Sequence, residues 1–285
     1  MQHSYGDWQP GHLRLHAPAL YVLLNGPSAN SKEVFKLGLR ELVGRGLLRP
    51  ATLQQGSGKK TTRTGVLLGG ARPTGDLERS LRSILDVWSA ASPRTEVEGG
   101  SGVTVANLAG TLRSRHGGKL SKWVEDEVLA VLVERGLYSR EEYKRLWIIP
   151  ATRYEPTREG KAARALLEES VARSTSEFPG WASNEPARAA TFLALAGPAV
   201  LLMPELQPAI SRFRRSLDGD AVPLAVDTGR IEDQDDQEFD GDVLDSFESD
   251  LETVSNDIDY SSIDSDSGAD SGSDSDGGGD GGGSD

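Results

Sequence analysis

Residues 132–160 read LVERGLYSREEYKRLWIIPATRYEPTREG, and residues 146–149 within them form the apolar run LWII. Lys144 and Arg145 precede this run, and Pro150 follows it. A run of this length is too short for a helix and indicates one arm of a β-hairpin, with the chain reversing near Pro150 and Ala151. Two interpretations of its apolar side chains remain open: burial against the core or in a subunit contact, or contact with a membrane.

Apolar residues recur at helical spacing on both sides of this expected hairpin. The expected helices cover residues 31–47, 73–88, 103–115, 121–135, 157–171 and 186–203. Ser31 and Thr74 are the expected N-caps, Gly46 and Gly136 mark helix ends, and Pro179 is expected in a loop. The last helix is apolar nearly all round, which predicts a central position in the fold.

Residues 51–70 indicate a second hairpin, because two strand-like segments flank the basic, Gly-rich turn GSGKKTTRTG. The predicted fold class is therefore mainly α: a single helical bundle domain over residues 16–216 with one or two small β-hairpins. Residues 1–15 are expected to form a flexible N-terminus, and residues 217–285 a disordered acidic tail rich in Asp, Ser and Gly.

Charge divides the chain at the same boundary. The formal net charge is −13, but from Leu217 onward 23 acidic residues accompany one base, Arg230, which gives −22. Residues 1–216 hold 30 basic and 21 acidic residues and carry +9. The basic body favours anionic partners. The tail is either a solubilising segment or a docking segment that competes with such partners as an intramolecular brake.

Several classes of function lack their sequence signals. The chain has no Cys, its four His residues are not paired at metal-ligand spacing, and GSGKKT does not have the spacing of a phosphate-binding loop. We therefore expect no enzymatic activity and no cofactor. The N-terminus lacks an apolar signal core, and Gly197-Pro198 interrupts the longest apolar run, so we expect a cytoplasmic protein without a signal peptide or transmembrane segment.

A nucleic-acid-binding function is the alternative that the first hairpin suggests. A helix followed by a hairpin with a basic turn is the pattern of a winged helix, with residues 31–47 as the recognition helix and residues 56–65 as the wing. The charge of the body suits DNA phosphates as well as lipid phosphates. The many apolar residues of that helix favour a core position instead, so nucleic acid is the less favoured partner.

Four segments together resemble the Golgi phosphoprotein 3 family and its bacterial members in particular. They are, in chain order, ELVGRGLLRP (residues 41–50), ARPTGD (71–76), LVERGLYSREEYKRLWIIPATRYEP (132–156) and WASNEPARAATFLALAG (181–197). The resemblance implies a helical bundle with an apolar hairpin that inserts into membranes and makes oligomer contacts. Eukaryotic members bind phosphatidylinositol 4-phosphate and hold glycosyltransferases at the Golgi, so it also implies a non-enzymatic peripheral membrane adaptor with protein clients.

By this resemblance the hairpin covers residues 144–154. The membrane-inserting residues would be Leu146, Trp147, Ile148 and Ile149, and the lipid-binding residues would be Lys122, Lys144, Arg145, Arg153 and Arg158. The positions of the family's lipid pocket fall near Gly26 and Phe35 and on Lys122 and Glu125, so only Lys122 retains a positive charge there.

Overall fold

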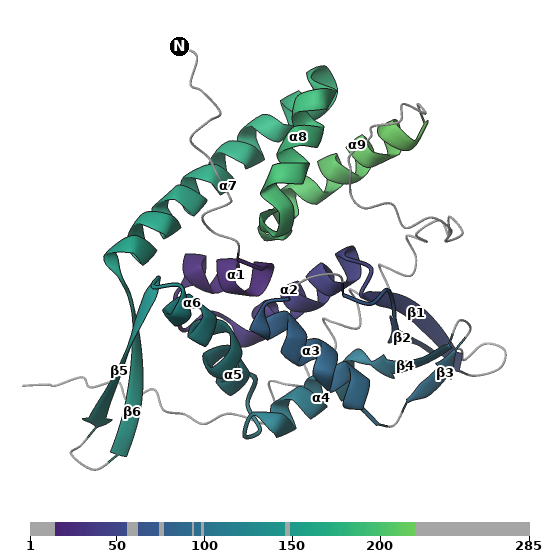
Figure 1. Cartoon of the computed structure of the whole chain (residues 1–285). Coiled ribbons are helices and arrows are strands. Elements are labelled where there is room, and N and C mark those ends of the chain that lie inside the picture. Colours follow the sequence, from purple (N-terminus) through teal and green to yellow (C-terminus); the bar gives the residue numbers. More distant parts are fainter. Residues whose placement is uncertain are drawn as a thin grey trace, which may run out of the picture.

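The computed structural model describes residues 15–55, 62–73, 77–92, 94–97, 100–145 and 149–219 (Figure 1). The fold is mainly helical with two small antiparallel sheets, which confirms the predicted fold class. The elements are, in chain order, α1 (Ala17–Asn25), α2 (Ser31–Gly44), β1 (Leu48–Gln55), β2 (Thr62–Gly69), α3 (Arg79–Ala90), β3 (Thr95–Val97), β4 (Gly100–Thr104), α4 (Val105–Arg115), α5 (Leu120–Trp123), a π-helical turn (Val124–Leu129), α6 (Ala130–Glu134), β5 (Tyr138–Arg145), β6 (Ile149–Pro156), α7 (Arg158–Asn184), α8 (Pro186–Ala196), two 3-10 turns (Gly197–Leu202 and Pro204–Leu206) and α9 (Gln207–Gly219). Among these described helices, none has the length and apolar character that crossing a bilayer requires.

The main hydrophobic core lies among α1 to α6, the four-stranded sheet and the first half of α7. Its largest fully buried side chain is Trp123, whose indole Nε1 donates a hydrogen bond of 2.8 Å to Ser83 Oγ. One buried carboxylate, Glu41, joins α2 to the start of α1: it accepts a 2.7 Å hydrogen bond from Ala17 N and a 2.6 Å one from Arg45 Nη2, and it contacts the His16 ring. These bonds satisfy a group that would otherwise be costly to bury.

Two helices end in the same way, and each then enters a hairpin. Both α2 and α6 are followed by Arg-Gly-Leu, with the glycines in the left-handed region (Gly46, φ 66°; Gly136, φ 71°), as the sequence predicts for helix ends. The first residue after β2 donates its N–H to the carbonyl of Leu47, and the first residue after β6 donates to that of Leu137, both at 3.0 Å. The chain thus builds the helix–turn–hairpin unit twice.

The first hairpin belongs to a four-stranded sheet of order β1-β2-β4-β3. β1 and β2 pair from Leu48↔Gly69 to Gln55↔Thr62, which confirms the hairpin predicted over residues 51–70. Trp88 of α3 donates its indole N–H to Leu67 O at 2.9 Å and packs over Gly69, where a Cβ would lie only 2.7 Å from the ring. This contact fixes the sheet against the helical core.

A second, smaller hydrophobic cluster is formed by the later part of α7 with α8 and α9. Here the prediction of one central helix over residues 186–203 is wrong. The α-helix ends at Ala196, and in α8 only Ala189 and Ala196 are buried. Its apolar residues are mostly alanines, and it packs against α7, where Phe192 contacts the rings of Phe178 and Trp181, while Leu195 is 55% exposed.

Four smaller predictions of helix boundaries are also wrong. Pro179 lies inside α7, because the aromatic residues Phe178 and Trp181 beside it are buried in the second cluster and offset the lost helical hydrogen bond. Asn30, rather than Ser31, caps α2 by accepting from the N–H of Lys32. The two remaining boundaries concern α3 and α4: α3 begins at Arg79, well after Thr74, which is outside the described residues, and α4 begins at Val105 because residues 103–104 complete β4.

Candidate functional site

Hairpin β5–β6 extends away from the helical body (Figure 1). Its strands pair from Tyr138↔Pro156 to Arg145↔Ile149, so three residues, Leu146, Trp147 and Ile148, separate the last pair. These three lie outside the described residues. The expected reversal near Pro150 is wrong, because Pro150 pairs with Lys144 within β6; both strands of a two-stranded sheet are edge strands, where proline is tolerated.

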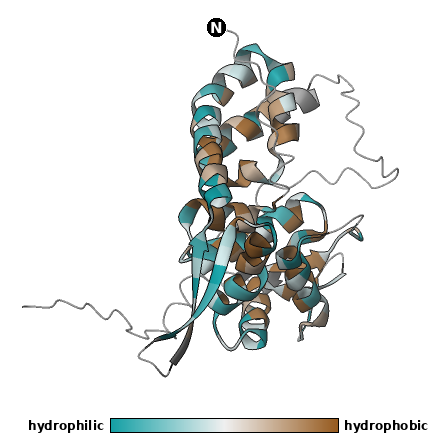
Figure 2. Cartoon of the chain, turned by 60° about the vertical axis from the view of Figure 1, so that its left-hand side comes forward, coloured by the Kyte–Doolittle hydropathy of each residue, from teal (hydrophilic) through white to brown (hydrophobic). Residues whose placement is uncertain are grey.

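The two faces of the hairpin differ in exposure. Tyr138 is buried, and Tyr154 packs partly against the main core with its hydroxyl donating to Glu125 Oε1 at 3.3 Å. The alternating positions belong to the opposite face, where Tyr143 is 48% exposed and Arg153 is also exposed. Figure 2 shows mainly hydrophilic residues along both strands. An exposed tyrosine beside the sequence LWI therefore stands out on this hairpin.

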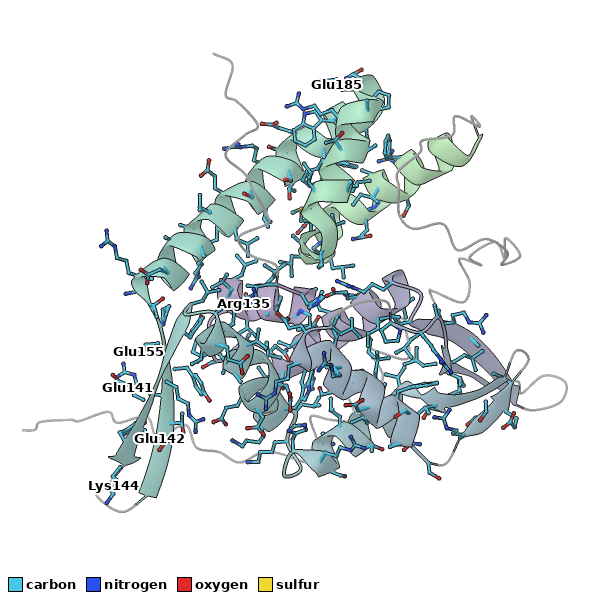
Figure 3. All side chains as sticks on the ribbon, viewed as in Figure 1. Arg135, Glu141, Glu142, Lys144, Glu155 and Glu185 are labelled. Atoms are coloured by element: carbon cyan, nitrogen blue, oxygen red, sulfur yellow. The ribbon has the colours of Figure 1, made fainter. Side chains whose placement is uncertain are left out.

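Positive charge is least compensated near the free end of the hairpin. In its middle, Arg153 pairs with Glu155 at 2.7 Å, and Arg140 pairs with Glu142 at 3.0 Å. Lys144 is exposed and forms no ion pair within the described part of the chain. Figure 3 shows Glu155, Glu141 and Lys144 in succession toward the free end. Acidic residues thus offset the basic ones in the middle of the hairpin, whereas Lys144 has no acidic partner among the described side chains.

The predicted lipid-binding residues do not all come together. Arg158 is the first residue of α7 and lies at the base of the hairpin, eight strand residues from its free end. At about 3.3 Å per residue, that length is far beyond the reach of one headgroup. Lys144 and Arg145 share the free end of β5, while the side chains of Arg145 and Ile149 are outside the described residues. Lys122 lies on α5 in the body.

The turn between α4 and α5 adds basic residues that the sequence analysis did not select. Arg115 and Lys119 are both exposed there, and Arg113 donates to Gly118 O at 3.2 Å. In Figure 1 this turn lies at the same lower end of the molecule as the free end of the hairpin. The sequence signal for this turn is the run RSRHGGKLSK, residues 113–122, in which basic residues cluster around two glycines. Both glycines adopt positive φ in the structure.

A chain of polar contacts joins this turn to the hairpin. It runs from Tyr154 to Glu125, then through Lys122 Nζ, which lies 3.0 Å from both Glu125 Oε2 and Asp126 Oδ1, and on to His116 Nδ1, 3.2 Å from Asp126 Oδ2. Glu125 first and Asp126 second raise the pKa of Lys122. Burial acts to raise the pKa of Asp126, but the hydrogen bonds from His116 and Lys122 outweigh it, so that pKa is lowered. Two carboxylates therefore hold and neutralise the charge of Lys122.

Of the four positions that the resemblance assigns to a lipid pocket, Phe35 is taken up by core packing and Lys122 is paired with acidic residues. Phe35 is buried and meets the Trp123 ring edge-on, with centroids 6.1 Å apart. Trp123 is fully buried, so neither aromatic residue is open to a headgroup. Gly26 is the half-buried C-cap of α1. A phosphate group prefers several convergent cations, whereas Lys122 here is already paired with acids.

The winged-helix interpretation needs an exposed recognition helix, and α2 does not provide one. It packs against α1, α3, α5 and β1. Its buried residues are Val34, Phe35, Leu37, Gly38, Leu39, Glu41, Leu42 and Val43. Lys36 is held by Glu33 at 3.0 Å with 12% of its side chain exposed. This burial argues against insertion of α2 into a DNA groove, and the proposed wing tip with Lys59 and Lys60 lies outside the described residues.

Among the described residues, no three His, Asp or Glu side chains are placed to hold a metal ion. No family model matches this sequence, and no curated protein matches it either. The family resemblance is therefore carried by the four sequence segments given above.

Proposed function

We propose that this protein is a non-enzymatic peripheral membrane protein that binds anionic lipid through the free end of hairpin β5–β6 and the basic α4–α5 turn. One observation carries the proposal: exposed Tyr143 and Lys144, which has no ion partner among the described residues, precede the sequence LWI at the end of a hairpin that extends from the body. The α4–α5 turn, which carries exposed Arg115 and Lys119, lies at the same end of the molecule. An apolar connection is unusual, because hairpin turns favour Gly, Asn and Asp.

Electrostatic attraction and burial of apolar side chains together supply enough free energy for such a contact. Each Lys or Arg near an anionic surface contributes about 1 kcal/mol. A buried large apolar side chain contributes about 1.5–3 kcal/mol, and tyrosine suits an interface because one end is apolar and the other polar. Either term alone gives weak, reversible binding, and the two together hold a protein at a membrane.

The expected lipid preference follows from the charges. The family resemblance implies phosphatidylinositol 4-phosphate, but Lys122 is neutralised by Glu125 and Asp126. The remaining described cations lie on two separate elements, the α4–α5 turn and the hairpin. We therefore propose binding governed by the charge density of the membrane, with phosphatidylinositol 4-phosphate acting as one anionic lipid among others.

Vesicle co-sedimentation tests this proposal. The full chain is mixed with neutral vesicles and with vesicles carrying matched surface charge from phosphatidylglycerol or phosphatidylinositol 4-phosphate. We expect binding to both anionic types, reduced by Trp147→Ala and by Tyr143→Ser. The matched control is Leu195→Ser, which removes a similarly exposed apolar side chain from α8. Equal loss in all three variants, or no binding to any vesicle, contradicts the proposal. Loss of a dimer instead of loss of vesicle binding assigns the hairpin to a subunit contact.

A further inference from the structure

We propose that residues 220–285 of the same chain dock on the basic α4–α5 turn and thereby cover part of the surface assigned above to the membrane. The docking is an intramolecular contact between two parts of the chain and does not depend on lipid. Its regulatory consequence, competition with anionic lipid, rests on the proposed function.

The receiving surface is the α4–α5 turn. Arg113, Arg115, Lys119 and Lys122 lie within ten positions of one another, and Arg115 and Lys119 are exposed. Arg115 forms no ion pair with any residue that the structure describes. Glu125 and Asp126 both contact Lys122. Residues 113–126 contain four basic and two acidic residues, so this segment has a formal charge of +2, which favours an anionic occupant.

The occupant is identified by charge. Residues 220–285 contain 22 Asp and Glu against one base, Arg230, whereas residues 1–216 carry +9. An acidic segment is attracted most strongly to a surface where positive charges are not already paired with nearby acidic residues. Interactions between exposed charges act over roughly one Debye length, about 8–10 Å at physiological salt. The α4–α5 turn meets that condition better than α7, where Arg164 and Arg173 each pair with a glutamate on the same helix.

The length of the chain allows the contact. Residues 220–285 follow directly on α9, which ends at Gly219. At no more than ~3.5 Å per residue, the first twenty of them can extend on the order of 70 Å. A body of about 200 residues has a radius of gyration of only ~16–17 Å. Every later acidic residue can therefore reach the turn, and a tether of this kind gives an effective concentration on the order of millimolar.

Carbodiimide cross-linking of the full chain without lipid tests the docking, because this reagent joins lysine amines to carboxylates that touch them. The chain has eight lysines: Lys32, Lys36, Lys59, Lys60, Lys119, Lys122, Lys144 and Lys161. The internal pairs Lys36–Glu33 and Lys122–Glu125, both at 3.0 Å, report that the reagent works. We expect links from residues 220–285 to concentrate on Lys119 and Lys122 at low salt and to disappear at high salt.

A charge-reversal pair keeps the proposal falsifiable. Arg115→Glu leaves every lysine in place and should abolish the links to Lys119 and Lys122. Arg49→Glu, at an exposed arginine within β1, is the matched control and should leave them unchanged. Links concentrated on Lys32, Lys36, Lys59, Lys60 or Lys161, links that survive Arg115→Glu, or an absence of links between residues 220–285 and the body would each overturn the proposal. Because no membrane is present, its failure is distinct from failure of vesicle binding.

Discussion

Gly160, in the first turn of α7, can be replaced by alanine only by moving backbone. A Cβ at this position would lie 1.9 Å from the carbonyl oxygen of Leu137, the residue immediately before the second hairpin. That oxygen is held in place by the N–H of Thr157 at 3.0 Å and by the Thr157 hydroxyl at 3.2 Å. Gly180 lies on the same helix, and a Cβ there meets nothing within 4 Å. The two glycines therefore form a matched pair.

The substitutions Gly160→Ala and Gly180→Ala should shift stability in opposite directions. Alanine in an open helix position stabilises by about 0.5–1 kcal/mol. At Gly160 the same gain is outweighed by overpacking and by hydrogen bonds lost at Leu137 O, a net cost of about 2–4 kcal/mol. This corresponds to a fall in Tm of roughly 5–15 °C. Thermal unfolding followed by circular dichroism measures both variants. Equal shifts, or stabilisation by Gly160→Ala, would refute the close contact between α7 and the base of the hairpin.

Three further predictions concern charged residues. Glu41→Ala should cost about 2–4 kcal/mol in denaturant unfolding, because it leaves the buried N–H of Ala17 without an acceptor and Arg45 without its carboxylate partner. The value is below that of a fully buried pair because Arg45 is 39% exposed. Burial raises the pKa of Glu78 above its ordinary value of 4.5, so the folded chain binds this proton more tightly than the unfolded chain. Above the raised pKa the carboxyl group of Glu78 is ionised and lowers the stability of the fold, and this loss disappears as the pH falls toward 4.5. Glu78→Gln should therefore raise the free energy of unfolding near neutral pH. It should also flatten the pH dependence of that free energy between pH 4.5 and the raised pKa of Glu78. Lys122→Gln leaves Glu125 and Asp126 without their cation, and Arg115→Gln removes an exposed cation, so each variant lowers the charge of the turn by one unit and should weaken binding to anionic vesicles. Unchanged vesicle binding by either variant would contradict a contact between the membrane and the α4–α5 turn.

Local patterns in the sequence were sufficient for much of the fold. The apolar spacing of residues 31–47 and 121–135, with a glycine after each helix, predicts α2 and the segment from α5 to α6. The π-helical turn Val124–Leu129 has no sequence signal of its own, because it keeps the same buried face as the helix around it. Both hairpins are also predicted, since each combines strand-like residues with a short connection.

The errors arise where tertiary packing outweighs a local rule. Pro179 predicts a loop, but Phe178 and Trp181 hold α7 helical across it. The register of the second hairpin depends on Thr157 N–H binding Leu137 O at its base, a contact between residues twenty apart in sequence. Periodicity alone cannot specify such a contact, so the reversal was placed too late in the chain.

The candidate site was predicted only in part for a similar reason. The hairpin and Lys144 follow from the apolar run LWII and the basic residues on either side of it. The spacing of Lys122, Glu125 and Asp126 on one helix predicts that they pair. The sequence does not predict that Tyr154 and His116, which come from other elements, contact the same two carboxylates. Arg115 and Lys119 gain their significance only because the fold places their turn at the same end as the hairpin.

The central claim is that the free end of hairpin β5–β6 enters an anionic membrane surface. The chain has no cysteine, so Tyr143→Cys and Leu195→Cys each introduce a single thiol for a polarity-sensitive fluorophore, one on the hairpin and one at a similarly exposed position on α8. On addition of phosphatidylglycerol vesicles to the full chain, we predict a blue shift of the label at position 143 and none at position 195. A blue shift at both positions, or at position 195 alone, would contradict the claim, and so would an unshifted label at position 143 on vesicle-bound protein.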